Sequence, residues 1–137
     1  MISEPQSTYF KKLFIAAKKV RDNAHVPYSK FKVGASILTN KNIIFSGCNV
    51  ENAAYPQSQC AEASAIGSMV SSGQKNILEL LVIGSGDLPC SPCGGCRQRI
   101  REFASLTIPI HICNTKGHIK TLKLSDLLPD SFGPENL

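Results

Sequence analysis

The first part of the chain places hydrophobic residues three and four positions apart, with lysines between them. These hydrophobic residues are Phe10, Leu13, Phe14, Ala17 and Val20. This spacing brings them to one face of an α-helix and leaves the lysines on the opposite face. The pattern therefore predicts an amphipathic helix over Pro5–His25, which we expect Pro27 to end.

Three segments read as β-strands. FKVGASILT (Phe31–Thr39) and IIFSGCNV (Ile43–Val50) flank the short polar stretch NKN, which predicts two strands joined by a hairpin turn. ILELLVIG (Ile77–Gly84) is almost continuously hydrophobic, as expected of a strand that is buried on both faces.

Helices and strands alternate through the rest of the chain. Helical composition over Cys60–Ser72 ends at Gly73, which is well placed as a C-terminal cap. A second helix is expected from Gly94 to about Ala104, followed by strands over Ile108–Cys113 and His118–Leu124. SDLLP predicts a short helical turn and DSFGPENL a loose tail. The order of elements predicts a layered α/β domain.

Length and composition favour an intracellular protein of one domain. The 137 residues can bury a sizeable core without disulfides. No hydrophobic run approaches the ~20 residues that span a bilayer, and MISEPQST lacks the pattern of a secretion signal. We therefore expect a cytoplasmic protein that does not bind membranes. Because the cytosol keeps thiols reduced, closely spaced cysteines there favour a metal or catalytic site over a disulfide.

The net charge of +5 raises the possibility of nucleic-acid binding. The basic residues fall in three groups, which are Lys11, Lys12, Lys18, Lys19 and Arg21; Arg97, Arg99 and Arg101; and Lys116, Lys120 and Lys123. No aromatic residues lie between them in a basic stripe. This distribution favours ordinary solvated faces and predicts no nucleic-acid partner.

The stretch PCSPCGGCRQ (Pro89–Gln98) contains three of the six cysteines. Cys93 and Cys96 stand where one helix is expected to begin, and Cys60 stands at the start of another. Helix N-termini favour thiolates over thiols, so two adjacent helix starts could present three thiolates to one zinc ion. Structural zinc sites normally have four protein ligands, whereas three ligands leave a position for water.

Glu62 supplies the acid–base group that such a site needs. It follows Cys60 by two residues and could move a proton from the bound water to a leaving nitrogen. Zinc deaminases as a class have such a glutamate followed by Pro-Cys-x-x-Cys. The alternatives are a thioredoxin-like redox pair, a purely structural zinc site, and Cys90 as a fourth ligand, although Cys90 precedes the turn at Pro92.

The remaining cysteines and the histidines have simpler interpretations. Cys48 and Cys113 lie in strand patterns and are expected to be small buried hydrophobic residues. His25, His111 and His118 are isolated from one another, which favours packing or surface roles over metal binding.

Five motifs together resemble one family. They are VPYSKFKVGA, GCNVENAAYP, CAE, SPCGGCRQ and LLPDSFGP. The chain is similar over nearly its whole length to the small, homotetrameric, three-cysteine cytidine deaminases. The resemblance implies a three-layer α/β/α fold with a mixed five-stranded sheet. It also implies zinc-dependent hydrolytic deamination of cytidine and deoxycytidine in pyrimidine salvage, with one zinc per subunit and active sites shared between subunits.

Residue roles follow from the resemblance position by position. Cys60, Cys93 and Cys96 match the zinc ligands, and Glu62 matches the proton shuttle. Among the substrate-binding positions, Phe31 matches a residue that packs on the pyrimidine, and Ala61 matches one whose backbone contacts the base. Asn49 and Glu51 match the residues that bind the ribose. Tyr55 and Phe132 match residues that reach a neighbouring subunit's site, and the resemblance implies that the tail of about 129–137 extends to that neighbour. Simpler alternatives are a core residue for Phe31, turn residues for Asn49 and Glu51, and a tail anchor for Phe132.

One position departs from the family pattern. The family commonly has an arginine directly after the catalytic glutamate, where it offsets the charge of the cysteine sulfurs, and this chain has Ala63. The rival functions are an RNA-editing adenosine deaminase, a deaminase of a cytosine-containing antibiotic, and a zinc-binding interaction domain without activity. Cys60 in place of histidine and the NVEN stretch favour a free nucleoside over the editing enzyme.

Overall fold

The computed structural model describes residues 7–137, so Pro5 and Gln6 of the first predicted helix lie outside it. The helices are α1 (Phe10–Arg21), α2 (Ala61–Ser71), α3 (Gly94–Phe103) and α4 (Leu124–Leu127). The strands are β1 (Gly34–Thr39), β2 (Ile44–Cys48), β3 (Ile77–Ile83), β4 (Pro109–Asn114) and β5 (Gly117–Lys123). Two short 3₁₀ turns cover Tyr55–Gln57 and Pro134–Asn136.

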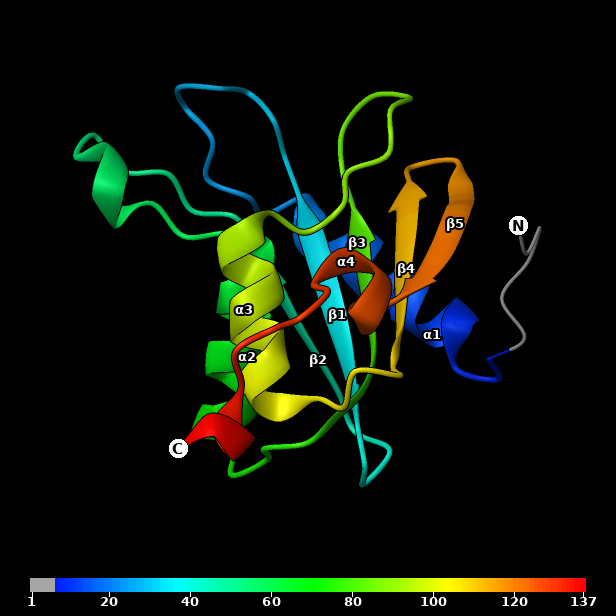
Figure 1. The fold of residues 1–137 in the computed structure, drawn as a ribbon. Helices are drawn as coiled ribbons and strands as arrows, with labels where there is room; N and C mark the ends of the chain where they lie inside the picture. The colour runs from blue at the N-terminus through cyan, green and yellow to red at the C-terminus, as the bar shows by residue number, and fades with distance from the viewer. Residues whose placement is uncertain (1–6) are drawn as a thin grey trace.

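The five strands form one sheet in the order β2-β1-β3-β4-β5 (Figure 1). β3 and β4 are parallel, and α3 connects them; the other neighbouring strands are antiparallel. The predicted hairpin joins β1 to β2, with Leu38 opposite Ile44 next to the turn. The mixed five-stranded sheet expected of an α/β fold is therefore confirmed.

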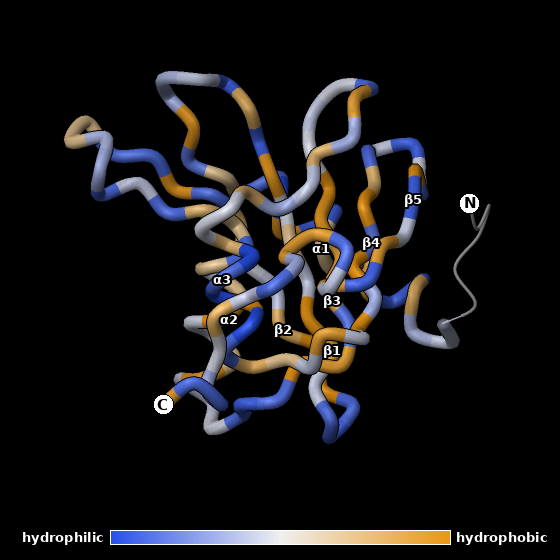
Figure 2. The backbone as a smooth tube through the Cα atoms, viewed as in Figure 1, coloured by the Kyte–Doolittle hydropathy of each residue, from blue (hydrophilic) through white to orange (hydrophobic). Residues whose placement is uncertain are grey.

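Helices cover both faces of the sheet. α1 packs on one face, where Leu13 and Ala17 meet Leu81 and Ile83 of β3. α2 and α3 lie on the other face, where the core includes Leu80 and Val82 of the same strand. Because successive side chains of a strand point to opposite faces, β3 contributes to both cores. The hydrophobic colour accordingly concentrates along the central strands (Figure 2).

Several predicted boundaries are wrong by a few residues. α1 ends at Arg21 and not at His25, because the His25 amide bonds to Asn49 O, and Glu51 N bonds to His25 O. These bonds tie His25 to another segment, so the helix ends before it reaches Pro27. The strand expected from Phe31 begins at Gly34, and the last strand ends one residue before Leu124, which opens α4.

Two glycines allow the layers to approach closely. A Cβ on Gly47 of β2 would lie 2.3 Å from the backbone nitrogen of Ala65 in α2. A Cβ on Gly34 of β1 would lie 2.1 Å from the carbonyl oxygen of Ala17 in α1. Both distances are far shorter than a contact between nonbonded heavy atoms. Each helix therefore packs directly against the strand backbone at a glycine, where a side chain would not fit.

The C-terminal tail, which we expected to be loose, is attached to α3. Gln98 Nε2 donates to Phe132 O over 2.9 Å, and Arg101 Nε donates to Ser131 Oγ over 3.0 Å. Arg101 also forms an ion pair with Glu135 and is only 6% exposed. The expectation that the basic residues of this helix form a solvated face is therefore wrong for Arg101. Within residues 7–137, none of the helices combines the length and hydrophobicity needed to cross a membrane.

Candidate metal centre and active site

Two helix N-termini bring three cysteines together. Cys60 occupies the N-cap position of α2, and Cys93 occupies the N-cap position of α3. Cys96 lies in the first turn of α3, on the buried side. The three Sγ atoms lie within 4.8 Å of one another. Among the described residues, these cysteines form the one group of histidine, cysteine and acidic side chains close enough to hold a metal ion.

The spacing and chemistry of these sulfurs fit zinc. Two sulfurs bound to one zinc ion at about 2.3 Å, with tetrahedral angles, lie about 3.8 Å apart. The Cys60 and Cys93 Sγ atoms are separated by 3.9 Å. Thiolates at helix N-termini are soft ligands that suit zinc. The cluster is therefore positioned to bind one zinc ion through three protein ligands.

Arg97 holds the loop that precedes Cys93. Its Nε donates to Pro92 O over 2.7 Å, and its Nη2 donates to Ser91 Oγ over 3.2 Å. Its Nη1 reaches Leu127 O over 2.8 Å. The guanidinium thus connects the cysteine loop to the last residue of α4, and the sequence pattern of a basic helix face did not indicate this role.

Glu62 lies beside the cysteines and is almost fully buried, with 5% of its surface exposed. Burial, with a smaller contribution from the negative charge on Cys60, raises the pKa of this carboxyl to about 7. A carboxyl with a pKa near neutrality can both accept and donate a proton at physiological pH. The position two residues after Cys60 therefore gives Glu62 the environment of a general acid–base group.

The cysteines influence one another's ionisation in the protein without metal. Hydrogen bonds from Cys96 and, to a smaller extent, Cys93 lower the pKa of Cys60 to about 6, with a further contribution from the charge of Arg99. The hydrogen bond with Cys60 raises the pKa of Cys96. Cys60 is accordingly the first of these two thiols to ionise.

Cys90 stays outside the cluster of three. Its thiol is half-buried, and burial together with the charges of Glu62 and Cys60 raises its pKa. A Cβ on Gly84 would meet Cys90 Cβ at 2.3 Å and the Phe31 ring at 3.6 Å. Cys90 thus packs near Phe31, and the two residues line the same hollow.

The other cysteines and histidines have structural surroundings. Cys113 is fully buried in the core beneath α1, whereas Cys48 is only partly buried, so the expectation of burial is wrong for Cys48. His111 is also buried, and its ring nitrogens lie 2.8 Å from Glu79 Oε2 and 2.9 Å from Thr121 Oγ1. This polar network lies in the sheet beside α1.

Several loops project from the end of the sheet at which α3 begins (Figure 1). A hollow of about 520 Å³ is lined by Phe31 and by 85–91, including Cys90. Phe31 is 41% exposed, so the alternative of a core residue does not describe it in the single chain. Its ring therefore forms part of an open wall next to the cysteine loop.

Glu51 lies in a second hollow, of about 400 Å³, which it shares with Tyr28, Ser29, Tyr55 and Ser58. Glu51 Oε1 accepts hydrogen bonds from the Tyr28 and Ser29 amides at 3.0 and 3.1 Å. The pKa of Glu51 is lowered mainly by the hydrogen bond from the Ser29 hydroxyl. The carboxylate is therefore held in place and ionised at neutral pH.

Asn49 is already engaged with the backbone near Phe31. Its Oδ1 accepts from Val33 N over 2.8 Å, and its Nδ2 donates to Phe31 O over 2.9 Å. An amide can form up to four hydrogen bonds, so one donor and one acceptor position are left for a ligand. Asn49 thus also orients the segment that carries Phe31, a role that the sequence did not indicate.

The last three predicted site residues lie in different surroundings. Ala61 is fully buried as the first residue of α2, where backbone N–H groups have no partner within the helix. Tyr55 is 73% exposed, and its ring lies edge-on to that of Tyr28 at 6.0 Å. Phe132 is 59% exposed on the tail beside α3 and lines neither of the two hollows described above.

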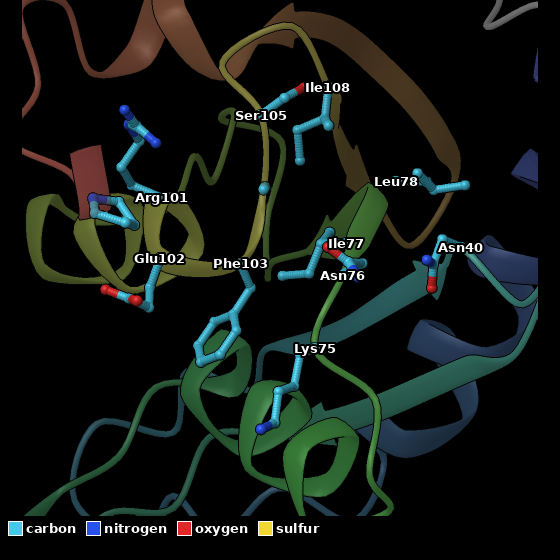
Figure 3. Close-up of a pocket in the computed structure, with 12 residues that line it drawn as sticks. Asn40, Lys75, Asn76, Ile77, Leu78, Arg101, Glu102, Phe103, Ser105 and Ile108 are labelled. Carbon is cyan, nitrogen blue, oxygen red and sulfur yellow. The ribbon is translucent and has the colours of Figure 1, made fainter.

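A further hollow, of about 460 Å³, lies where α2 and α3 end and is shown in Figure 3. Lys75, Asn76 and Phe103 are among its lining residues. Its lining within residues 7–137 includes no cysteine or histidine, and it lies at the helix ends opposite to the cysteine cluster. The three cysteines and Glu62 therefore lie at the N-terminal ends of the two helices.

Comparisons with known proteins agree with this site. The family model described as the cytidine and deoxycytidylate deaminase zinc-binding region matches residues 7–112. A cytidine deaminase of Sporosarcina psychrophila is 43% identical over 127 residues, covering 93% of each chain. One from Halalkalibacterium halodurans is 35% identical over 121 residues, covering 88% of this chain and 92% of the relative. The crystal structure of cytidine deaminase from Burkholderia pseudomallei superposes with a TM-score of 0.84 at 40% identity, covering 89% of this chain and 98% of that chain.

Proposed function

The chain belongs to the cytidine and deoxycytidylate deaminase family, and on that premise we propose that it hydrolyses cytidine and deoxycytidine to uridine and deoxyuridine. Water adds at C4 of the pyrimidine, the bond from C4 to the amino nitrogen breaks, and ammonia leaves. The observation that carries the proposal is the cluster of Cys60, Cys93 and Cys96 beside the buried Glu62.

Cys60, Cys93 and Cys96 would hold the zinc ion. Zinc in such a site lowers the pKa of its water to about 7, which makes a nucleophile available at neutral pH. Glu62 accepts the proton of the attacking water and delivers it to the leaving nitrogen. Its burial supports this role, because a desolvated carboxyl with a pKa of about 7 can act in both directions.

The rim residues recognise the nucleoside. Phe31 packs on the pyrimidine, and the backbone of Ala61 contacts the base. Asn49 and Glu51 bind the ribose hydroxyls, since an amide and a carboxylate can together donate to and accept from them. The hydrogen bonds that fix both side chains support the role, because they orient these groups before the substrate arrives.

The active species is a homotetramer with sites shared between subunits. Tyr55 and Phe132 complete the site of a neighbouring subunit, and the tail of about 129–137 carries Phe132 to it. Their exposure in the single chain, 73% and 59%, supports this arrangement, because large apolar side chains gain from burial at an interface. The chain acts as one cytoplasmic domain in pyrimidine salvage.

The decisive test of the activity is a spectrophotometric assay on purified, zinc-loaded protein. We expect loss of the cytidine absorbance with equal amounts of uridine and ammonia formed. Free cytosine and adenosine are the control substrates, and we expect much slower turnover of both. Absence of cytidine turnover at full zinc occupancy, or faster turnover of adenosine, would contradict the proposed function.

The shared site can be tested by mixing two inactive proteins. Glu62→Gln subunits retain Phe132 but lack the proton shuttle, whereas Phe132→Ala subunits retain Glu62 but lack the aromatic side chain. Mixed tetramers should recover activity if one subunit's Phe132 serves another's site. Light scattering should show tetramers throughout; a monomeric active species, or no recovery in mixed tetramers, would refute the arrangement.

A further inference from the structure

The cysteine cluster carries more negative charge than zinc can neutralise. Three thiolates exceed the charge of one Zn²⁺ by one, and ionised Glu62 adds another negative charge. Cys96 and Glu62 are buried, at 0% and 5% exposure. Because buried uncompensated charge is costly, a positive group close to the sulfurs would stabilise the metal-bound state.

Three arginines follow the cysteines on α3, and two of them are committed elsewhere. Arg97 donates to the loop of Pro92 and to Leu127 O. Arg101 is buried against the tail, where it pairs with Glu135. Within residues 7–137, the guanidinium of Arg99 forms no hydrogen bond or ion pair that would hold it away from the cysteines.

Arg99 reaches back toward the start of its own helix. Its Nη1 lies 3.2 Å from the position that a Cβ on Gly95 would occupy, and Cys93 Sγ lies 4.0 Å from the same position. The guanidinium and the sulfur therefore both lie close to the space left by the missing side chain.

Ala63 leaves room for this arrangement. Ala63 and Arg99 line the same hollow, of about 500 Å³, together with Gln59 and Glu102. The short side chain of Ala63 offers no charge to the sulfurs but does not block the approach of Arg99. Glu102 forms no ion pair with Arg99 in the described part of the chain, so the positive charge remains available to the cysteines.

We propose that Arg99 is a positioning residue that offsets the thiolate charge and stabilises zinc in the cluster. It acts through the cysteines and does not touch the substrate. The inference rests on zinc being the metal of the proposed function. Arg99 is the one exposed arginine of α3. It supplies the positive charge that the uncharged Ala63, directly after Glu62, does not supply.

The test measures zinc release and needs no substrate. Zinc-loaded protein is mixed with a chromogenic chelator, and the release rate is followed for Arg99→Gln, Arg99→Lys and Lys75→Gln. Lys75 is exposed at the far ends of the helices, so its variant removes the same charge far from the sulfurs. We expect release roughly two- to fivefold faster for Arg99→Gln at low salt and near the original rate for the other two variants.

Salt dependence separates an electrostatic role from a structural one. The effect of Arg99→Gln should shrink toward none at 1 M salt, where screening acts over ~3 Å. Release at the original rate at low salt, an equal effect at both salt concentrations, or the same effect in Lys75→Gln would overturn the inference. Protein that holds zinc but does not deaminate cytidine would refute the proposed function, and the release rates would still decide the role of Arg99.

Discussion

Glu62→Gln isolates the proton transfer from the rest of the site. Glutamine has almost the same shape as glutamate and can keep its hydrogen bonds, but it cannot exchange a proton near neutral pH. Because α2 and both N-caps are unchanged, we expect zinc to stay bound. Deamination should fall by at least the roughly 10²–10⁴-fold that general acid–base catalysis contributes, since Glu62 serves in more than one step.

The same substitution has a second consequence that follows from burial. Burial raises the pKa of Glu62 from 4.5 to about 7, so the folded state binds this proton more tightly than the unfolded state. Stability is then lost as the pH rises from 4.5 through 7. At about 1.4 kcal/mol per pH unit, the ionised carboxylate costs the zinc-free fold about 3 kcal/mol above pH 7, and glutamine avoids this cost.

Urea unfolding of the zinc-free proteins measures this difference. We expect Glu62→Gln to match the original protein near pH 4 and to have a higher free energy of unfolding, by about 3 kcal/mol, near pH 8. Turnover and zinc content of the loaded proteins are measured in parallel. A difference in stability that does not change with pH would refute the raised pKa of Glu62. A variant that keeps a tenth of the turnover would refute the proton shuttle.

Three further predictions follow from the geometry of the site. Cys93→Ala should lose zinc by elemental analysis, whereas Cys90→Ala should retain it; loss from the second variant would contradict the three-cysteine cluster. Glu51→Ala should lower kcat/KM for cytidine strongly while leaving the slow turnover of free cytosine unchanged, because only the nucleoside has ribose hydroxyls; an equal loss for both substrates would argue against ribose binding. Gly47→Ala should destabilise the fold by about 1–3 kcal/mol in urea unfolding, since its Cβ would meet the α2 backbone. Gly67→Ala is the control, because nothing lies within 4 Å of the new Cβ, and a loss of stability there would refute the packing argument.

Local patterns were sufficient to predict most of the elements. The continuous hydrophobic run over Ile77–Ile83 becomes the strand whose side chains enter both cores. Gly73 follows α2 with φ +87°, the left-handed conformation expected of a helix cap. Such features depend on a few neighbouring residues, so their spacing along the chain is informative.

The ends of elements depended on distant partners. α1 stops at Arg21 because His25 is bonded to Asn49 and Glu51, which lie on another segment. No property of residues 21–25 indicates that partner. The tail likewise appeared loose from its composition, but Arg101 and Gln98 hold it against α3.

The cysteine cluster could be foreseen from the sequence because each cysteine stands at a helix start, and helix starts are local features. How close the sulfurs lie, and which charged group stands nearest to them, depended on the packing of α2 against α3. Arg97, Arg99 and Arg101 look equivalent along the chain. In the structure, Arg97 holds a loop, Arg99 lies next to Gly95, and Arg101 is buried in an ion pair. Spacing along one helix sets the direction of each side chain, but only the tertiary structure decides what each of them meets.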